Sequence, residues 1–567
     1  MLGVYSARLR ASPVPRLPSF ARIVLPAALI AVFVALAAYA LDRPGYYYDE
    51  VIFVPVALRV LGQCDVDAAV TMQAGCLPLM QTLGYVGAIK AWLHAPVFAA
   101  FGINVWTVRL PSILIGAAAL YVLWRFAKRE LGVAWALLLL ALLATDPVLV
   151  NHARLDWGPQ MIATLARVAS VAALWRWLQT GRMHWLVTLC AALVVGFFDK
   201  LNFVWVIAAL AGATLATAPR LALDRLRTGA PWQPALAGVT AVLLLWGTVT
   251  LVRRAARLDV LGDAGTFDAV AQFVKVWNLY ATTFSGTSVI NWVFGTEAVE
   301  TSAFNYLALL QIATAVVLLA VWRPWTPARH LLAFLTAFMA LLFIAITATR
   351  QVGGTHHLVM LWPLPILHLV TLVAISAQHI ADARPGSMRG ARVTMATVGI
   401  AVCGTLLAWN IGWALRNVDT WQNDRDYRPQ FDAAIARLDA RLDALGVDRV
   451  ISVDWGLHQQ LVTLADRKRA ANYREWTWRL LDAPDLERDE LRRAVAEHMH
   501  GKRVAFVLHA PPFETFTGAR ARLDALLARD RPCDVSEQTF VNTAGKALYT
   551  IVVADYRNCG VSVKPPG

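Results

Sequence analysis

The segment Gly45-Tyr46-Tyr47-Tyr48-Asp49-Glu50 comes just after the uncharged run Ile23–Leu41. This run is long enough to cross a bilayer as a helix, and tyrosines favour the membrane interface where such a helix ends. Two carboxylates at that depth cost free energy unless they face water, a cation or a substrate. The segment therefore predicts a membrane helix that carries Asp49 and Glu50 to a functional site. The alternative is an aromatic belt in which the acids are incidental.

The composition of the chain is that of a membrane protein. Of its 567 residues, 58% are hydrophobic and 16% are charged, whereas a soluble domain carries about 25% charged residues. The formal net charge of +14 alone would suggest nucleic acid as a partner. Because the arginines cluster between apolar runs and form no continuous basic segment, they indicate membrane topology instead.

Apolar runs recur over residues 23–413 and predict an α-helical polytopic membrane domain of about eleven helices. Several runs are shorter than the ~20 residues of a full span, so they need flanking residues or a tilt. The runs are Ile23–Leu41, Leu110–Trp124, Val133–Val150, Met161–Trp175, Trp185–Phe198, Phe203–Ala218, Ala235–Val252, Tyr306–Trp322, Leu331–Thr347, Leu358–Ile375 and Val393–Trp413.

Arginine clusters predict the side of the membrane that each loop faces. Residues 1–22 contain four arginines, and most later clusters fall on the same side when the helices are threaded in order. The positive-inside rule makes that side cytoplasmic, although the cluster at 253–257 falls on the other. No small-residue cleavage pattern precedes Asp42, so we expect the first helix to be retained.

The predicted outer face carries several polar loops. The first, residues 42–109, is long and apolar, and Pro78–Phe101 predicts one or two helices lying along the membrane surface. A short loop is expected at Asp146–Pro159 and a compact turn at Asp199–Asn202.

Residues 414–567 have the composition of a soluble domain and predict a small α/β domain on the outer face. Its motif Asp454-Trp455-Gly456 repeats Asp156-Trp157-Gly158, which we interpret as a chance turn at a strand end. The expected elements are helices near Phe431–Leu445 and Ala519–Ala528 and strands at Arg449–Val453, Val504–Leu508 and Ala547–Val553.

Four of the six cysteines lie in predicted outer regions. Cys64 and Cys76 are in the first loop, and Cys533 and Cys559 are in the C-terminal domain. Two local pairs suit two disulfides in an oxidising compartment, and four free thiols are the alternative. Neither pair has CxxC spacing, which argues against a metal site.

The candidate functional residues are polar residues that the predicted topology places on the outer face. The chain has no P-loop, HExxH, GxSxG or EF-hand pattern. Each residue alone could be an ordinary loop residue, but their shared face indicates a site. They are Asp49, Glu50, Lys90, Asp156, Lys200, Arg350, His356 and His357.

An aromatic first loop that opens with Asp49-Glu50 resembles the GT-C class of membrane glycosyltransferases. The resemblance is strongest to bacterial relatives of protein O-mannosyltransferases and of the aminoarabinose transferase (glycosyltransferase family 39). Trp106-Thr107-Val108-Arg109-Leu110-Pro111-Ser112 resembles the family's entry into its second helix. Gly196-Phe197-Phe198-Asp199-Lys200 is similar to its Gly-x-x-x-Thr-Lys turn, with Asp199 where Thr is usual. His357–Pro363 is similar to its late basic-plus-proline segment, and the resemblance covers residues 23–380.

The resemblance implies transfer of a sugar from a polyprenyl-phosphate donor at the outer face of the bacterial inner membrane. The acceptor would be a lipid, a polysaccharide or a protein, and nucleic acid is not expected as a partner. An acceptor hydroxyl must lose its proton as it attacks, so a carboxylate base is needed. The family gives that role to the first acid of the loop, here Asp49, with Glu50 and Asp156 as supporting acids.

The leaving phosphate needs positive charge. No cofactor is implied, and a role for a divalent cation is left open. The candidate phosphate ligands are Lys90, Lys200, Arg350, His356 and His357.

Two other classes of function fit part of the sequence. A transporter or lipid flippase also carries charged residues within a helical bundle, but the chain shows no internal repeat and no paired, interrupted helices. A structural membrane protein with the C-terminal domain as an interaction module leaves Asp49 and Glu50 unexplained. Only the transferase interpretation predicts release of polyprenyl phosphate from a lipid-linked sugar.

Overall fold

The chain forms two compact units. Unit 1 comprises residues 1–41, 83–87 and 109–426, and unit 2 comprises residues 42–82, 88–108 and 427–567. Most of the first loop therefore belongs with the C-terminal domain. The computed structural model describes residues 18, 20–81, 84–158, 160–257, 268–295, 302–321, 327–349, 354–381, 389–423, 427–465, 467–481 and 489–557.

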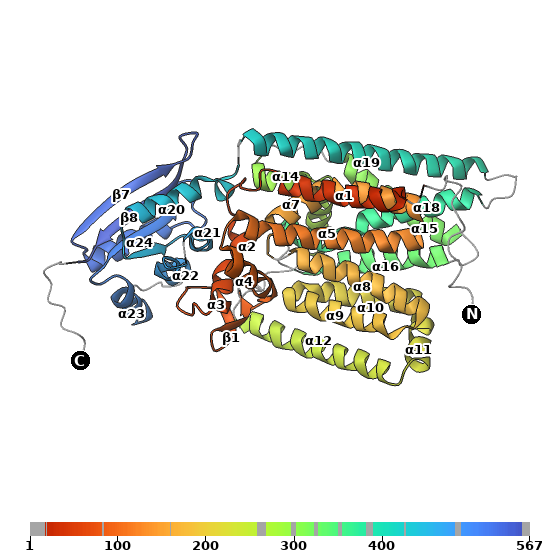
Figure 1. Ribbon diagram of the computed structural model, residues 1–567, viewed down its shortest axis with the longest axis horizontal. Helices are drawn as coiled ribbons and strands as arrows, with labels where there is room; N and C mark the ends of the chain where they lie inside the picture. The colour runs from red at the N-terminus through yellow and green to blue at the C-terminus, as the bar shows by residue number, and fades with distance from the viewer. Residues whose placement is uncertain are drawn as a thin grey trace. The chain divides into compact units, whose positions relative to one another are not determined.

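Unit 1 is a bundle of helices. Figure 1 shows its long helices running along one common direction, with the short α11 turned across them. Helices suit this apolar sequence because they satisfy their backbone hydrogen bonds internally. In chain order they are α1 (Ala21–Ala38), α5 (Val105–Glu130), α6 (Val133–Ala144), α7 (Pro147–Leu155), α8 (Gln160–Thr180), α9 (Met183–Asp199), α10 (Val204–Thr217), α11 (Pro219–Thr228), α12 (Trp232–Arg257), α13 (Ala269–Phe284), α14 (Thr287–Phe294), α15 (Ser302–Val321), α16 (Pro327–Thr347), α17 (Thr355–Leu358), α18 (Leu364–Ala381) and α19 (Arg389–Asn423).

The predicted apolar runs all lie on helices. Among the described residues, eight helices are long and apolar enough to cross a membrane, or up to ten if each bent pair is one span. One bent pair is α6 with α7, at 56°, and the other is Leu201–Thr217 with α11, at 97°. The one run not covered by these spans, Trp185–Phe198, corresponds to α9, which is apolar and has 17 residues. The prediction of a polytopic membrane protein is confirmed.

The segment Asp146–Pro159 is largely helical, not the short loop that we expected. Asp146 caps α7, because its Oδ1 accepts a hydrogen bond from the Leu149 N–H at 2.8 Å. Proline at the first helical position, Pro147, suits that start. The expected single helix Val133–Val150 is thus broken between α6 and α7. The break places Asp156 at the end of a separate short helix.

Two buried arginines hold the end of α1. Arg154 donates to the carbonyls of Ala37, at 3.0 Å, and Tyr39, at 2.5 Å, and Arg109 donates to the carbonyl of Leu41 at 2.5 Å. The last carbonyls of a helix lack partners within it, and cations are favourable at that end. The two arginines therefore fix the point at which the chain leaves the membrane helix.

The first-loop part of unit 2 contains a hairpin as well as helices. The prediction of surface helices throughout Pro78–Phe101 is wrong in its first half, because Pro78 lies in a strand that pairs antiparallel with its neighbour. The apolar composition of this stretch hid the two-residue period of a strand. The elements are α2 (Tyr48–Val51), α3 (Phe53–Val60), β1 (Val70–Ala74), β2 (Leu77–Gln81) and α4 (Ile89–Phe101).

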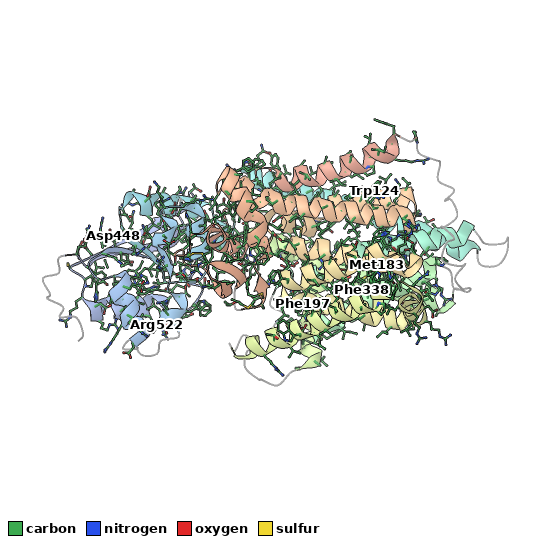
Figure 2. The ribbon with its side chains drawn as sticks, turned by 60° about the horizontal axis from the view of Figure 1, so that its bottom comes forward. Trp124, Met183, Phe197, Phe338, Asp448 and Arg522 are labelled. Atoms are coloured by element: carbon green, nitrogen blue, oxygen red, sulfur yellow. A yellow bond between two sulfur atoms is a disulfide. The ribbon has the colours of Figure 1, made fainter. Side chains whose placement is uncertain are left out.

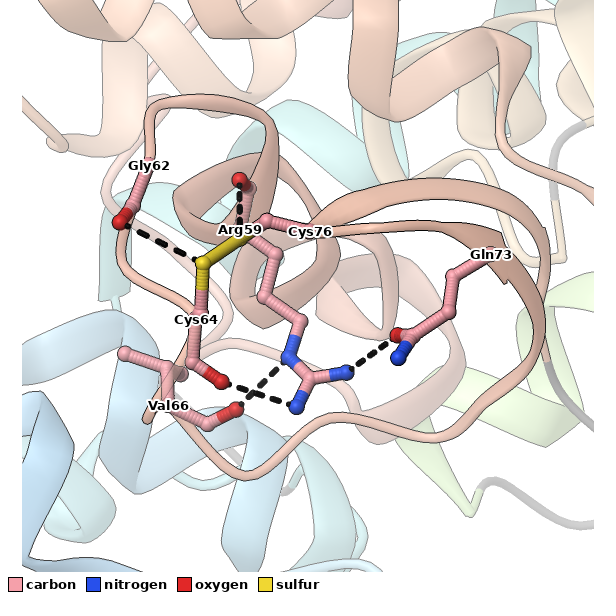
Figure 3. Close-up of a disulfide and its surroundings, with 6 residues drawn as sticks. All are labelled: Arg59, Gly62, Cys64, Val66, Gln73 and Cys76. Atoms are coloured by element: carbon pink, nitrogen blue, oxygen red, sulfur yellow. Dashed lines mark hydrogen bonds between the residues drawn. A yellow bond between two sulfur atoms is a disulfide. The ribbon is translucent and has the colours of Figure 1, made fainter.

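A disulfide joins Cys64 to Cys76, as predicted (Figure 3). The Arg59 guanidinium lies inside the closed loop and donates to the carbonyls of Cys64, at 2.9 Å, and Val66, at 3.0 Å. It also donates to the side chain of Gln73 at 2.9 Å. One side chain thus satisfies three acceptors and braces the loop that the disulfide closes.

The second predicted disulfide is only partly described. Cys533 is disulfide-bonded, and its predicted partner Cys559 lies outside the described residues. Cys190 and Cys403 are free and buried in the helical bundle.

The C-terminal part of unit 2 is built on a five-stranded sheet of order β5-β4-β6-β8-β7. The strands β5, β4 and β6 are parallel, and β8 and β7 are antiparallel additions. The predicted strands correspond to β4, β6 and β8. The sequence missed β5, which has three residues, and β7, whose exposed residues show no alternation. Their bounds are β4 (Arg449–Ser452), β5 (Tyr473–Glu475), β6 (Arg503–His509), β7 (Asp534–Val541) and β8 (Ala547–Asp555).

Helices cover both faces of this sheet, because successive strand residues point to opposite sides. Val450 packs with α20 and α21, whereas its neighbour Ile451 packs with α22, α23 and α24. The carboxyl ends of β5, β4 and β6 share one edge, where open α/β sheets bind ligands. The helices are α20 (Ala434–Ala444), α21 (His458–Leu464), α22 (Thr477–Leu481), α23 (Asp489–His498) and α24 (Ala519–Asp530).

Candidate functional site

The two predicted acids of the first loop lie on α2 but differ in burial. Glu50 is buried, and its Oε2 accepts a hydrogen bond from the Tyr47 N–H at 3.2 Å. It thereby caps the helix that carries it, since the first N–H groups of a helix lack internal partners. Asp49 is partly exposed. Of the two acids, Asp49 is the more exposed.

Lys90 lies beneath this helix and not at a surface. Its side chain is only 2% exposed, its Nζ donates to the Glu50 carbonyl at 3.5 Å, and it lies 4.4 Å from the centre of the Phe53 ring. We expected a flexible ammonium that reaches lipid headgroups. The observed position instead suits support of α2, because a cation at the C-terminal end of a helix is favourable.

The C-terminal domain also holds α2, through a residue that the sequence analysis did not select. Asp454 is fully buried, and its Oδ2 accepts from His509 Nδ1–H at 2.7 Å and from the Thr515 N–H at 3.1 Å. Its Oδ1 accepts from the Trp455 N–H at 2.8 Å. The Trp455 ring packs on Tyr48 of α2, with ring centres 4.3 Å apart. The turn that we interpreted as chance therefore supports the acid-bearing helix.

Asp156, in unit 1, uses its carboxylate to join helices. Its Oδ1 accepts from the N–H groups of Gln160, at 2.8 Å, and Met161, at 2.9 Å, which begin α8. Its Oδ2 accepts from the Ser112 hydroxyl of α5 at 2.9 Å. The side chain is 2% exposed. Ser112, the serine of the Arg-Leu-Pro-Ser segment, thus fixes the position of the Asp156 carboxylate.

Lys200 follows α9, and its side chain bonds to the turn that begins at Asp156. Its side chain is 5% exposed, and its Nζ donates to the Gly158 carbonyl at 3.1 Å. The backbone is fixed by a bridge between Lys200 and Val86 and by donation from the Leu201 N–H to the Tyr85 carbonyl at 2.9 Å. The predicted compact turn is therefore confirmed, and it presents a positive charge at the end of α9.

Histidines gather around this lysine. The rings of His356 and His357 lie 4.2 Å apart, and each histidine interacts electrostatically with Lys200. His356 also interacts with His152, a buried residue of α7 that the sequence analysis did not select. We call Lys200, which supplies the positive charge, together with His152, His356 and His357 the cation cluster.

His152 has one ring nitrogen available for a ligand. Its Nδ1–H donates to the Val148 carbonyl at 2.9 Å, so the neutral ring carries a lone pair on Nε2. This Nε2 is buried and makes no hydrogen bond to the part of the chain that the structure describes. The ring lies 4.9 Å from that of Trp157. The sequence prediction missed His152 because it placed a loop at Asp146–Pro159. Only on a helix does the four-residue spacing let this ring bond to the Val148 carbonyl.

Arg167 positions the segment that follows the histidine pair. It is buried and donates to the carbonyls of Val359 and Trp362, each at 3.0 Å, and to the Thr164 hydroxyl at 3.1 Å. The Trp362 Nε1–H in turn donates to Asp146 Oδ2 at 3.3 Å. These bonds tie the histidine segment to α8 and to α7, and α7 carries His152 of the cation cluster.

The remaining sequence predictions concern Arg350 and a metal. Arg350 lies outside the described residues. Among the residues that are described, no group of three or more His, Cys, Asp or Glu side chains could hold a metal ion.

Three comparisons relate the chain to known proteins. Residues 87–246 match the model of the dolichyl-phosphate-mannose-protein mannosyltransferase family. A segment of 113 residues is 26% identical to "Putative mannosyltransferase YycA" of Bacillus subtilis (strain 168) and covers 20% of this chain and 16% of that protein. The crystal structure of ArnT from Cupriavidus metallidurans bound to undecaprenyl phosphate matches over 97% of this chain and all of that chain, with a TM-score of 0.52 and 14% identity. The fold class predicted from the sequence is therefore confirmed.

Proposed function

We propose that this membrane protein is a glycosyltransferase of the GT-C class that takes its sugar from a polyprenyl-phosphate donor. The family model over residues 87–246 and the undecaprenyl phosphate named with ArnT support this choice. Mannose is the first candidate sugar, because the family model and the relative from Bacillus subtilis both bear its name. The proposed acceptor is a lipid, a glycan or a protein on the outer face of the inner membrane.

In this proposal Asp49 is the general base. It accepts the proton of the acceptor hydroxyl while the hydroxyl oxygen attacks the anomeric carbon, and the bond from that carbon to the phosphate oxygen breaks. The observation that carries the assignment is the difference within α2. Glu50 is buried and caps the helix, whereas Asp49 is partly exposed.

The cation cluster is the proposed site of the donor phosphate. A phosphate leaves with two electrons and gains negative charge, which a fixed ammonium and imidazole N–H groups stabilise. Lys200 is the principal ligand, with His356 and His357 beside it, and Arg350 stays a candidate from the sequence. Asp156 and Lys90 are assigned to positioning, since both are buried and bonded to helix ends.

The test is release of undecaprenyl phosphate. Purified protein is incubated with undecaprenyl-phosphate mannose and membranes from a deletion strain, and the lipid products are measured by mass spectrometry. The proposal predicts free undecaprenyl phosphate and a mannosylated product, both lost in the Asp49→Asn variant. A transporter would leave the donor intact. Release that persists undiminished in Asp49→Asn would overturn the base assignment.

A further inference from the structure

A long groove runs along α1 on the side that faces α5. Its volume is about 890 Å³. In Figure 2, α1 diverges from α5 towards the end where Trp124 is labelled. The lining residues are Arg22, Ile23, Pro26, Ala27, Ile30, Ala31, Val34, Ala35, Ala38, Tyr121, Trp124, Arg125 and Lys128.

The α1 wall of the groove is made largely of small residues. Five of its lining residues are alanine or proline, and they recur with the spacing of one helix face. Small side chains leave the space that a longer residue would fill. The result is an apolar groove along α1, lined on the α5 side by residues from Tyr121 to Lys128.

One end of the groove is strongly basic. Arg22 lines it at the start of α1, and Arg125 and Lys128 line it near the end of α5. Lys128 Nζ lies 4.7 Å from the Trp124 ring centre, and the Arg125 guanidinium lies 6.0 Å from that of Tyr121. Among the described residues that line the groove, none is acidic. An apolar channel that ends in three cations matches an acyl chain that ends in an anionic headgroup.

We propose that this groove binds an anionic phospholipid of the phosphatidylglycerol type. The headgroup phosphate lies among Arg22, Arg125 and Lys128, and an acyl chain follows the small residues of α1. The lipid fills space between α1 and α5 and adds a packing partner for α1, which has few buried residues of its own.

This site is separate from the proposed donor site. Ser112, which bonds Asp156, lies near the start of α5, and Lys128 lies sixteen residues further on. At 1.5 Å per residue the two positions are about 24 Å apart along the helix. One lipid phosphate cannot reach both, so the groove takes a lipid other than the bound donor.

The first experiment measures lipid retention by native mass spectrometry of the full-length protein. Phosphatidylglycerol, phosphatidylethanolamine and undecaprenyl phosphate are each added at equal concentration. We expect preferential retention of phosphatidylglycerol, which falls about fivefold in Arg125→Gln or Lys128→Gln and about 30-fold in the double variant. The charge-matched control, Arg129→Gln with Arg227→Gln, removes two exposed cations that do not line the groove.

A second pair of variants tests the channel without changing charge. Ala31→Leu fills the groove and should lower retention of phosphatidylglycerol several-fold, whereas Ala28→Leu, on another face of α1, should not. Equal retention of phosphatidylglycerol and phosphatidylethanolamine by the wild type would overturn the proposal. So would equal losses in the test and control variants, or preferential retention of undecaprenyl phosphate at this groove.

Discussion

Asp49 and Asp156 were both predicted as catalytic acids, yet the molecule uses their carboxylates differently. Asp156 is buried, and its two oxygens accept hydrogen bonds from two N–H groups and one hydroxyl. Asp49 is partly exposed on a four-residue helix whose other acid, Glu50, makes the capping bond. An acid near the membrane surface is therefore not by itself a candidate base. What separates the two is exposure, since Asp156 is 2% exposed and Asp49 is partly exposed.

The two candidate lysines also differ in their surroundings. Lys90 supports the acid-bearing helix from below, and Lys200 lies among histidines at the end of α9. Both are largely buried, so burial does not distinguish them. Their neighbours do, because a phosphate is stabilised by an ammonium together with other N–H donors.

The largest effect should follow from removing the proposed base. Asp49→Asn keeps the size of the side chain but cannot accept a proton, so turnover should fall about 10²- to 10⁴-fold. The measurement is release of undecaprenyl phosphate from the mannosyl donor. Asp42→Asn, which changes an exposed acid of the same loop, is the matched control and should keep normal turnover. A comparable loss of turnover in Asp42→Asn would mean that Asp49 is not the base.

The next effect separates the lysines. Lys200→Gln should weaken binding of undecaprenyl phosphate about 10- to 100-fold, because a charge-assisted hydrogen bond is lost. Lys90→Met should leave that Kd unchanged and lower turnover instead, since it loosens α2. The measurement is Kd by ligand-induced shift in Tm, beside turnover. A weakened Kd in Lys90→Met with none in Lys200→Gln would reverse the two assignments.

The sequence predicted the membrane helices well because each apolar run must form a helix in hydrocarbon, whatever its neighbours. It predicted β4, β6 and β8 because buried strands of this domain are rich in branched residues. It failed at α7 and β2. There, short elements lie inside apolar stretches whose composition does not reveal the break.

The candidate site was predictable in its residue types but not in their roles. Nothing in the sequence distinguishes Asp49 from Glu50, because the difference arises from one capping bond. The repeated Asp-Trp-Gly was dismissed, yet in both copies the aspartate is buried and accepts backbone N–H groups at the turn. The bonds themselves differ, because Asp156 accepts from Gln160 and Met161 whereas Asp454 accepts from Trp455 and Thr515. The repeat therefore marks two buried, N–H-accepting aspartates and not one shared bond pattern.

A smaller effect, on stability, should follow from changing Asp156. Asp156→Ala removes the cap of α8 and the bond to Ser112, which should lower the free energy of unfolding by about 1–3 kcal/mol. Tm and folded yield should fall, while the molecules that fold keep most of their turnover. Ser112→Ala, which removes one of the bonds, should lie between this variant and the wild type. A normal Tm with lost turnover would return Asp156 to the catalytic group.

The smallest effect should be the pH dependence of stability that Glu475 causes. This carboxylate caps no helix, so it tests what burial does to the pKa of an acid. Its Oε2 accepts one hydrogen bond, from Gln459 Nε2 at 3.1 Å. Burial raises its pKa above the ordinary value of 4.5, and the nearby charge of Asp67 acts in the same direction. A carboxyl with a raised pKa in the folded state binds more protons there than in the unfolded chain. Its stabilising contribution is therefore complete below pH 4.5 and is lost as pH rises through the folded pKa.

Glu475→Gln should remove that dependence, because glutamine does not titrate. Below pH 4.5 the two proteins should have nearly equal Tm values, and above it the wild type should fall progressively behind the variant. Recording the difference in Tm at each pH cancels the titration of all other groups. Glu490→Gln, an exposed acid on α23, should show a constant difference. A constant difference for Glu475→Gln as well would mean that burial does not raise the pKa of this carboxyl, and the prediction would be wrong.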